Sequence, residues 1–268
     1  TIKEHVNRQD VVFHLAAIRG EFSIPWKTYY RINVEATRRL TELSFQSGVS
    51  TLVYVSSVGV HGTSPSRVPA DEQSPYNPDS SYHRSKMMAE QVIQGYADSL
   101  DTVIVRPTIT YGPSDTGFLH RVARIARTGF FPIVGEGANR VHLLHIDGLT
   151  ALLARVMVEH HTSGRIYIAA DKSPIRFRDL VKSTRVSAEE NLRFIRIPFT
   201  PFLRLAEAYD RLIAPALKAR SLEISFRLLS QPWYYSIKRA VKELGYHPHE
   251  TESNVKKTVQ WYFTQGWL

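Results

Sequence analysis

Three short and almost continuous apolar runs dominate the first 110 residues. They read VVFHLAA (11–17), TLVYVSS (51–57) and TVIVR (102–106). Strands that are apolar along their whole length are typical of parallel sheets covered by helices on both faces. The two segments between them, 33–48 and 81–99, have the apolar spacing of helices. This alternation predicts an α/β fold with a Rossmann-like, doubly wound parallel sheet.

The pattern becomes less regular after Pro107. We expect further strands at 141–147 and 165–169 and a helix at 149–159. A second amphipathic helix is predicted near residue 210, and we expect it to belong to a substrate domain or lid in preference to a membrane-surface anchor. The apolar residues on one side of that helix are Phe202, Leu205, Tyr209, Leu212 and Leu217.

Composition excludes several classes of protein. With 268 residues, 43% hydrophobic and 22% charged, the chain is expected to be globular and soluble. It has no cysteine, which excludes a disulfide scaffold and a Cys-ligated metal, and we predict no metal site. No apolar run approaches the roughly 18 residues of a membrane span, and no signal peptide is visible. We therefore expect a cytoplasmic protein.

The formal charge of +9 favours anionic partners. Arg121, Arg124 and Arg127 recur every three residues and fall on one face of a predicted helix. A solvated helix face is the first interpretation, a contact for a phosphate-bearing ligand the second, and an RNA groove the third and least favoured.

Tyr82 and Lys86 form the pair that most directly indicates chemistry. The spacing of four places both side chains on one helix face. A phenol has a pKa near 10, and an ammonium group beside it favours the phenolate, so Tyr82 becomes a usable general acid and base. The motif alone is weak, because Tyr234 and Lys238 repeat the spacing.

Two serines strengthen this interpretation. Ser56 and Ser57 end a predicted buried strand, where the sites of doubly wound sheets open. A hydroxyl at a strand end, with a Tyr–Lys pair on the next helix, is suited to proton transfer at a carbinol carbon while hydride leaves. A purely structural cap at the strand end is the alternative for Ser57.

Several motifs in this order resemble the extended short-chain dehydrogenase/reductases, and within them the NAD-dependent epimerase/dehydratase branch. They are VVFHLAA (11–17), Asn33-Val34, YVSSVGVHG (54–62), YHRSK (82–86), VRPTITYGP (105–113), LGYHP (244–248) and VQWYFTQGWL (259–268). The resemblance implies a partial Rossmann dinucleotide-binding domain over 1–110, to which 140–170 returns. Residues 111–268 would then form mainly a smaller substrate-binding domain.

The resemblance also implies roles for individual residues. The catalytic trio would be Ser57, Tyr82 and Lys86. Ser57 is preferred to Ser56 because it lies four residues before His61. Cofactor contacts are implied for Leu15, Ala16, Ala17, Arg19, Asn33, Ser56, Tyr82, Lys86, Pro107 and Thr108. Substrate contacts are implied for Val58, His61 and Arg140. Arg140 matches an arginine that binds the diphosphate of nucleotide-sugars, and a surface arginine without this role is the alternative.

Two departures from the family pattern affect these expectations. The 4,6-dehydratases of this branch carry Asp-Glu directly after the hydroxyl residue, whereas here the positions are Val58 and Gly59, which argues against 4,6-dehydration. The chain also lacks the opening Gly-rich turn that holds the pyrophosphate, and the residue that separates NAD from NADP. We therefore expect a fragment of a longer enzyme, inactive alone, rather than a naturally truncated relative.

The sequence thus predicts an enzyme that uses NAD or NADP, either as an oxidoreductase or as an epimerase. Its substrate would be a small molecule with a secondary alcohol, with a nucleotide-sugar favoured. The alternatives are a 3β-hydroxysteroid-type dehydrogenase and a non-catalytic relative that binds a dinucleotide or RNA. Nucleic acid is an unfavoured partner, and a homodimer is one candidate assembly.

Overall fold

The computed structural model describes residues 2–7, 9–19, 24–159, 163–186, 191–213 and 222–268. These residues form two compact units, and each unit is made of three separate segments of the chain. Unit 1 comprises 1–108, 150–169 and 236–246, and unit 2 comprises 109–149, 170–235 and 247–268.

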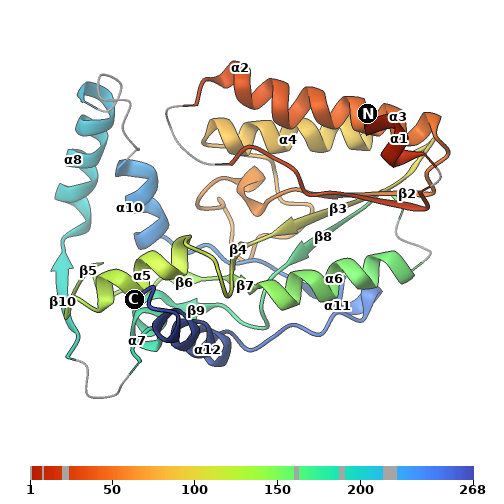
Figure 1. Ribbon diagram of the computed structural model, residues 1–268. Coiled ribbons are helices and arrows are strands. Elements are labelled where there is room, and N and C mark those ends of the chain that lie inside the picture. Colours follow the sequence, from red (N-terminus) through yellow and green to blue (C-terminus); the bar gives the residue numbers. More distant parts are fainter. Residues whose placement is uncertain (1, 8, 20–23, 160–162, 187–190, 214–221) are drawn as a thin grey trace. The chain divides into compact units, whose positions relative to one another are not determined.

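Unit 1 is built on a four-stranded parallel sheet in the order β1-β2-β3-β8 (Figure 1). Its strands are β1 (Val11–His14), β2 (Thr51–Val55), β3 (Asp101–Pro107) and β8 (Arg165–Ala169). The three expected apolar runs supply its first three strands. β1 and β2 are shorter than expected, because the chain leaves the ladder after His14 and Val55. Leu15 and Ala16 after β1 are exposed, whereas Ser56 after β2 is buried and Ser57 is half-buried.

Helices cover both faces of this sheet (Figure 1). On one side lie α3 (Ala36–Gln46) and α4 (Ser81–Gln94), and on the other α6 (Ile146–Val158) and α11 (Lys238–Leu244). A buried cluster between β2, β3 and α4 accounts for the apolar strand residues on the face of the sheet that α4 covers. Its members are Leu52, Tyr54, Ala89, Ile93, Leu100 and Ile104. The remaining elements of unit 1 are α1 (Ile2–Val6), α2 (Trp26–Tyr29), the π-helix η1 (Tyr30–Glu35) and the 3₁₀ helix η2 (Val58–His61).

Unit 2 contains three two-stranded ladders. β4 (Ile109–Tyr111) pairs in parallel with β7 (Leu143–His145), and β5 (Phe130–Val134) with β10 (Arg193–Ile197). β6 (Arg140–Val141) pairs antiparallel with β9 (Ile175–Arg176). The helices of unit 2 are α5 (Phe118–Ala126), α7 (Phe177–Ser183), α8 (Phe199–Leu212), α10 (Leu222–Ser230) and α12 (Thr251–Thr264).

Two expectations for unit 2 need correction. The strand expected at 141–147 is broken at His142, whose backbone N–H bonds the Trp233 carbonyl oxygen at 3.1 Å, and helix α6 has begun by Ile146. On α8, Leu205 and Leu212 are exposed, while Phe202 packs on Phe226 of α10 with ring centroids 5.0 Å apart. Leu217 lies outside the described residues. No helix in the described part of the chain is long and apolar enough to span a bilayer.

Candidate active site

Helix α4 carries the predicted Tyr–Lys pair and is anchored to the end of β2. The helix begins after Ser80, whose Oγ accepts a hydrogen bond from the His83 N–H at 3.1 Å. Lys86 is only 1% exposed, and its Nζ donates to the Val55 carbonyl oxygen at 2.7 Å. Burial lowers the pKa of Lys86 to about 7, and the Glu90 carboxylate one turn later opposes that shift. Lys86 therefore changes charge near neutral pH.

Tyr82 lies one helical turn before Lys86 and is half-buried. Within the described residues its hydroxyl makes no hydrogen bond, so this group is available to a ligand. Burial raises the pKa of Tyr82, and the charge of Arg19 partly offsets the effect. Because burial disfavours the phenolate of Tyr82, a neighbouring cation is needed to stabilise it. Lys86, one turn later on the same helix face, can supply that charge.

Ser57 lies two residues after the end of β2 and directly before η2. Its Oγ accepts a hydrogen bond from the Gly59 N–H at 3.1 Å, which leaves its own hydroxyl proton free to donate. Ser56 is buried, and among the described residues its Oγ has no hydrogen-bond partner. A buried hydroxyl without a protein partner is rare, so Ser56 Oγ is a candidate contact for a bound molecule.

Gly59 is required by a close approach between η2 and α4. A Cβ at this position would lie 2.2 Å from Cδ2 of His83. The His83 ring is held in place, since its Nδ1 lies 2.6 Å from Oδ1 of Asp79. No side chain fits at position 59 without displacing His83, and Val58 beside it is buried. Position 59 therefore has no room for the acidic side chain that the resemblance places there in 4,6-dehydratases.

Asn33 connects the loop after β1 to the first turns of α4. Its Oδ1 accepts from the Ile18 N–H at 2.8 Å, and its Nδ2 donates to the Ile18 carbonyl oxygen at 3.0 Å. The same Nδ2 donates to Ser85 Oγ at 2.8 Å, and Ser85 Oγ donates to the Tyr82 carbonyl oxygen at 2.7 Å. Asn33 lies in the π-helix η1, a rare conformation that is frequent at functional sites.

His14, at the end of β1, extends this polar chain. Thr37 Oγ1 donates to the Asn33 carbonyl oxygen at 2.7 Å, so it accepts from His14 Nε2 at 2.8 Å. Nε2 of His14 therefore carries a proton. Burial lowers the pKa of His14 to about 4, and the Lys86 charge acts in the same direction.

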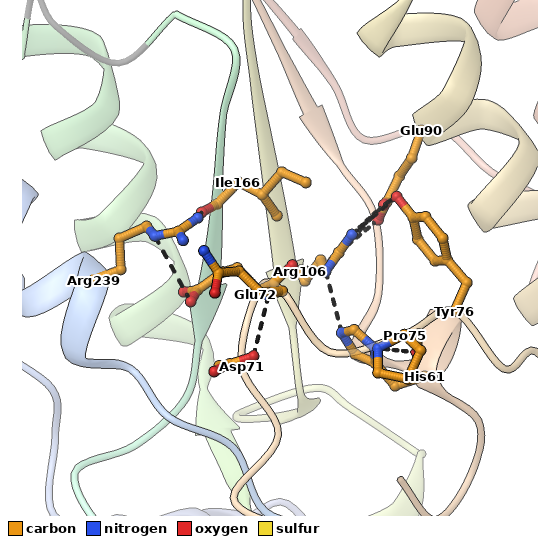
Figure 2. Close-up of polar contacts among 10 residues, drawn as sticks. His61, Asp71, Glu72, Pro75, Tyr76, Glu90, Arg106, Ile166 and Arg239 are labelled. Carbon is orange, nitrogen blue, oxygen red and sulfur yellow. Dashed lines mark hydrogen bonds and ion pairs between the residues drawn. The ribbon is translucent and has the colours of Figure 1, made fainter. Parts of the chain in front are cut away.

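A buried Arg106 connects β3 to both α4 and the segment after η2 (Figure 2). Its Nε and Nη2 donate to the Glu90 carboxylate at 3.0 and 2.7 Å. Nη2 also donates to Tyr76 Oη at 3.1 Å, and Tyr76 donates in turn to Glu90 at 2.8 Å. The Arg106–Glu90 ion pair is buried. A buried ion pair is stable only when its remaining polar atoms are hydrogen-bonded, and Tyr76 supplies such bonds to both partners.

His61 belongs to this Arg106 network (Figure 2). A guanidinium can only donate, so His61 Nε2 accepts from Arg106 Nη1 at 3.1 Å, and Nδ1 donates to the Pro75 carbonyl oxygen at 3.0 Å. Both ring nitrogens are thus engaged, and burial lowers the pKa of His61. A substrate contact through these nitrogens would require the network to open.

Glu72 extends the polar layer towards β8 and α11 (Figure 2). Its carbonyl oxygen accepts from Arg106 Nη1 at 3.2 Å, while its Oε1 accepts from the Ile168 N–H at 3.1 Å. Arg239 on α11 lies 3.8 Å from Glu72 Oε2 and donates to the Ile166 carbonyl oxygen at 3.1 Å. Through Glu72, the loop between η2 and α4 is therefore bound to Arg106 of β3 on one side and to β8 and Arg239 of α11 on the other.

The other predicted site residues fall into three groups. Leu15, Ala16 and Arg19 are exposed and Ala17 is half-buried, which leaves the surface after β1 open to a ligand. Pro107 ends β3, and Thr108 follows it with its N–H bonded to the Ala169 carbonyl oxygen at 3.0 Å. Arg140 is exposed on β6 of unit 2, and Arg121 and Arg124 of α5 are exposed, as is Arg127 directly after the helix.

These residues fit the nicotinamide-ribose half of a dinucleotide. Lys86 and Tyr82 could bind the ribose hydroxyls, and the exposed 15–19 segment, fixed by Asn33, could line the cofactor. The unpartnered Oγ of Ser56 supplies a further polar contact at the same sheet edge. His14, Thr37, Glu90 and the buried state of Arg106 were not foreseen, although Glu90 continues the i, i+4 spacing of Tyr82 and Lys86.

Residues 1–170 match the model of a family described as the NAD dependent epimerase/dehydratase family. The chain belongs to this family. The match covers well over half the chain and includes Ser57, Tyr82 and Lys86. It agrees with the fold expected from the apolar runs and with an enzyme that uses a nicotinamide cofactor.

Two curated relatives and one solved structure illustrate the similarity. An N-acetyl-alpha-D-glucosaminyl-diphospho-ditrans,octacis-undecaprenol 4-epimerase of Escherichia coli O157:H7 is 25% identical over 71% of this chain and 58% of its own length. A 2-alkyl-3-oxoalkanoate reductase of Stenotrophomonas maltophilia is 29% identical over 89% of this chain and 76% of its own length. The crystal structure of a Bacillus cereus UDP-glucuronic acid 4-epimerase with NAD shares the fold, with a TM-score of 0.75, 18% identity, and coverage of 97% and 74%. The chain thus spans 58% to 76% of these relatives.

Proposed function

We propose that the protein is an NAD(P)-dependent oxidoreductase or epimerase that acts on a secondary alcohol or the corresponding ketone. One observation carries the proposal: Lys86 is buried and bound to the end of β2, one turn from a Tyr82 hydroxyl that has no partner within the described residues. Ser57 follows that strand end by two residues. Family membership supports the same chemistry.

Tyr82 is the residue that exchanges a proton with the reacting oxygen. On oxidation its phenolate accepts the alcohol proton, and on reduction its phenol returns one. Lys86 stabilises the phenolate, and its pKa of about 7 makes the ammonium easy to form and to discharge. The Ser57 hydroxyl donates a hydrogen bond to the substrate oxygen, which stabilises the negative charge that develops on that oxygen. NAD(P), when bound, supplies or accepts the hydride.

Two substrate classes follow from separate observations. A nucleotide-sugar is the first, supported by the match of Arg140 to a diphosphate-binding position and by the similarity to epimerases. An apolar 3-oxo or 3-hydroxy compound is the second. It is supported by the similarity to a 2-alkyl-3-oxoalkanoate reductase, which extends over 89% of the chain.

The experiment uses the protein expressed from its complete reading frame. Calorimetric titration with NAD⁺ and NADP⁺ comes first, followed by cofactor reduction or oxidation with UDP-sugars and with 3-hydroxy- and 3-oxoalkanoates. We expect one cofactor to bind at micromolar concentration and one substrate class to turn over. Binding of neither cofactor by folded protein would contradict the proposal, and turnover of one class decides between the two.

A further inference from the structure

His83 lies directly after Tyr82 on α4 and takes no part in the hydride-transfer scheme above. The two aromatic rings are neighbours, with their centroids 5.8 Å apart. The His83 side chain is 20% exposed, so it is largely enclosed but still accessible to a ligand. An imidazole changes its protonation state near neutral pH more readily than any other unperturbed side chain, which makes His83 a candidate for a second acid–base group.

Asp79 orients the His83 imidazole. Nδ1 of His83 lies 2.6 Å from Oδ1 of Asp79, and Oδ2 of the same carboxylate accepts from the Thr63 N–H at 2.7 Å. Burial acts to raise the pKa of Asp79, but the bonds from His83 and Thr63 outweigh it and hold this pKa below its ordinary value. An ionised carboxylate can only accept, so Nδ1 donates the bond and Nε2 of the neutral ring keeps its lone pair.

Nε2 of His83 is therefore the ring nitrogen left for a substrate. It has no hydrogen-bond partner in the part of the chain that the structure describes. The ring lies over Gly59 and fills the space that a side chain at that position would occupy. The Gly59 N–H is in turn bonded to Ser57 Oγ at 3.1 Å. The imidazole thus packs beside Tyr82 and against the segment that begins with Ser57, the two residues assigned to the reacting oxygen.

We propose that His83 is a second proton-transfer residue and that the site therefore also exchanges the hydrogen on the carbon next to a ketone. The inference rests on the proposed function, because the ketone is the oxidised form of the substrate named there. A carbonyl oxygen and the neighbouring carbon are only two bonds apart. Side chains with adjacent rings can each reach one of them, with Tyr82 at the oxygen and His83 at the C–H bond.

The exchange needs no further reactant. Nε2 accepts the proton, the electron pair of the C–H bond becomes the C=C bond of an enolate, and the carbonyl π pair moves to the oxygen. The hydroxyls of Ser57 and Tyr82 donate hydrogen bonds to that oxygen, and Asp79 stabilises the imidazolium. In the reverse step the imidazolium returns a proton to the same carbon. Because His83 is partly exposed, its Nε2 proton equilibrates with water, so a ketone recovered from D₂O gains deuterium at this carbon.

The test measures deuterium uptake and hydride transfer in the protein expressed from its complete reading frame. The ketone probes are UDP-4-keto-6-deoxyglucose and 3-oxooctanoate. Exchange is followed by mass spectrometry in D₂O with oxidised NAD(P), which cannot reduce the ketone, and is corrected for a sample without protein. Hydride transfer to the same ketones is followed separately by the absorbance of reduced NAD(P).

The variant His83→Gln removes the base and keeps a polar side chain of similar size. We expect it to slow exchange by about 100-fold or more, the lower end of what general acid–base catalysis contributes, and to slow hydride transfer by less than about tenfold. His247→Gln, at an exposed position of unit 2, is the control and should keep both wild-type rates. If His83→Gln does not fold, His83→Ala leaves space over Gly59, and added imidazole should restore exchange.

Each outcome decides for or against His83. Hydride transfer by the wild type without exchange above the sample lacking protein would overturn this inference and leave the proposed function standing. Wild-type exchange in His83→Gln, equal losses of both rates, or folded His83→Ala that imidazole does not rescue would also overturn it, since a packing role on Gly59 affects both rates alike. Exchange that requires His83 in a protein that transfers no hydride would support this inference and contradict the proposed function. A wild type that shows neither reaction would contradict both.

Discussion

Arg106 and Glu90 form a buried ion pair between β3 and α4, with Nη2 and Nε of the arginine 2.7 and 3.0 Å from the carboxylate oxygens. Glu90 lies one turn after Lys86 on the same helix, and Arg106 also donates to His61 at the end of η2. A single guanidinium therefore fixes α4, which carries Tyr82 and Lys86, relative to the segment that begins with Ser57.

Removal of one member of this pair should be far more costly than removal of both. Arg106→Met leaves Glu90 buried without its cation, and we expect a loss of about 3–5 kcal/mol in the free energy of unfolding. The double variant Arg106→Met with Glu90→Leu should recover most of that loss. Urea unfolding of the two single variants and the double variant gives the coupling energy, and additive losses would show that the two residues are not coupled.

His14 should contribute to acid denaturation. Its pKa is about 4 in the folded protein and 6.5 when unfolded, so between these values the unfolded chain binds a proton that the folded one does not. Stability therefore rises with pH across pH 4–6.5, and His14 accounts for about 3 kcal/mol of this dependence. His14→Gln, which keeps a donor towards Thr37, should flatten the profile measured by urea unfolding. His247→Gln, at an exposed position, is the control, and an unchanged slope in His14→Gln would refute the assignment.

Asn33 should control the order of the loop after β1. Asn33→Ala leaves both main-chain groups of Ile18 without their partner, and we expect a loss of about 2–3 kcal/mol in the free energy of unfolding. Hydrogen exchange at the Ile18 amide should become faster, and NAD(P) affinity should fall because the 15–19 segment loses its anchor. Asn33→Asp keeps the acceptor for the Ile18 N–H but loses the donor, so it should be intermediate. Unchanged exchange at Ile18 in Asn33→Ala would show that the loop is held in another way.

Gly59 should reject even a small side chain. Gly59→Ala places its Cβ within 2.2 Å of the His83 ring, so η2 or His83 must move. We expect reduced stability and reduced turnover together, by about 1–3 kcal/mol in unfolding free energy. Gly59→Ala combined with His83→Ala should restore stability, as measured by thermal unfolding. A single variant with wild-type stability would contradict the packing argument.

Local pattern predicted the elements of unit 1 well, because buried parallel strands are apolar on both faces and Tyr82 and Lys86 share a helical spacing. The hydrogen bonds that support the candidate site could not be predicted from local pattern, because their partners are far apart in the sequence. His14 and Thr37 lie 23 residues apart, Arg106 and Glu90 16 apart, and nothing local distinguishes Arg106 from the other 23 arginines. The break at His142 was missed because it depends on Trp233, 91 residues later.

The measurement that tests the central claim most directly is the single-turnover rate of hydride transfer in Tyr82→Phe beside Tyr234→Phe. Both variants lose one phenolic hydroxyl four residues before a lysine, but only Tyr82 precedes the buried Lys86 on α4. We expect Tyr82→Phe to fold normally by circular dichroism, to bind NAD(P), and to lose roughly 10²–10⁴-fold in rate, because general acid–base catalysis is worth that much. Tyr234→Phe should keep the wild-type rate. A Tyr82→Phe enzyme that transfers hydride as fast as the wild type would contradict the account.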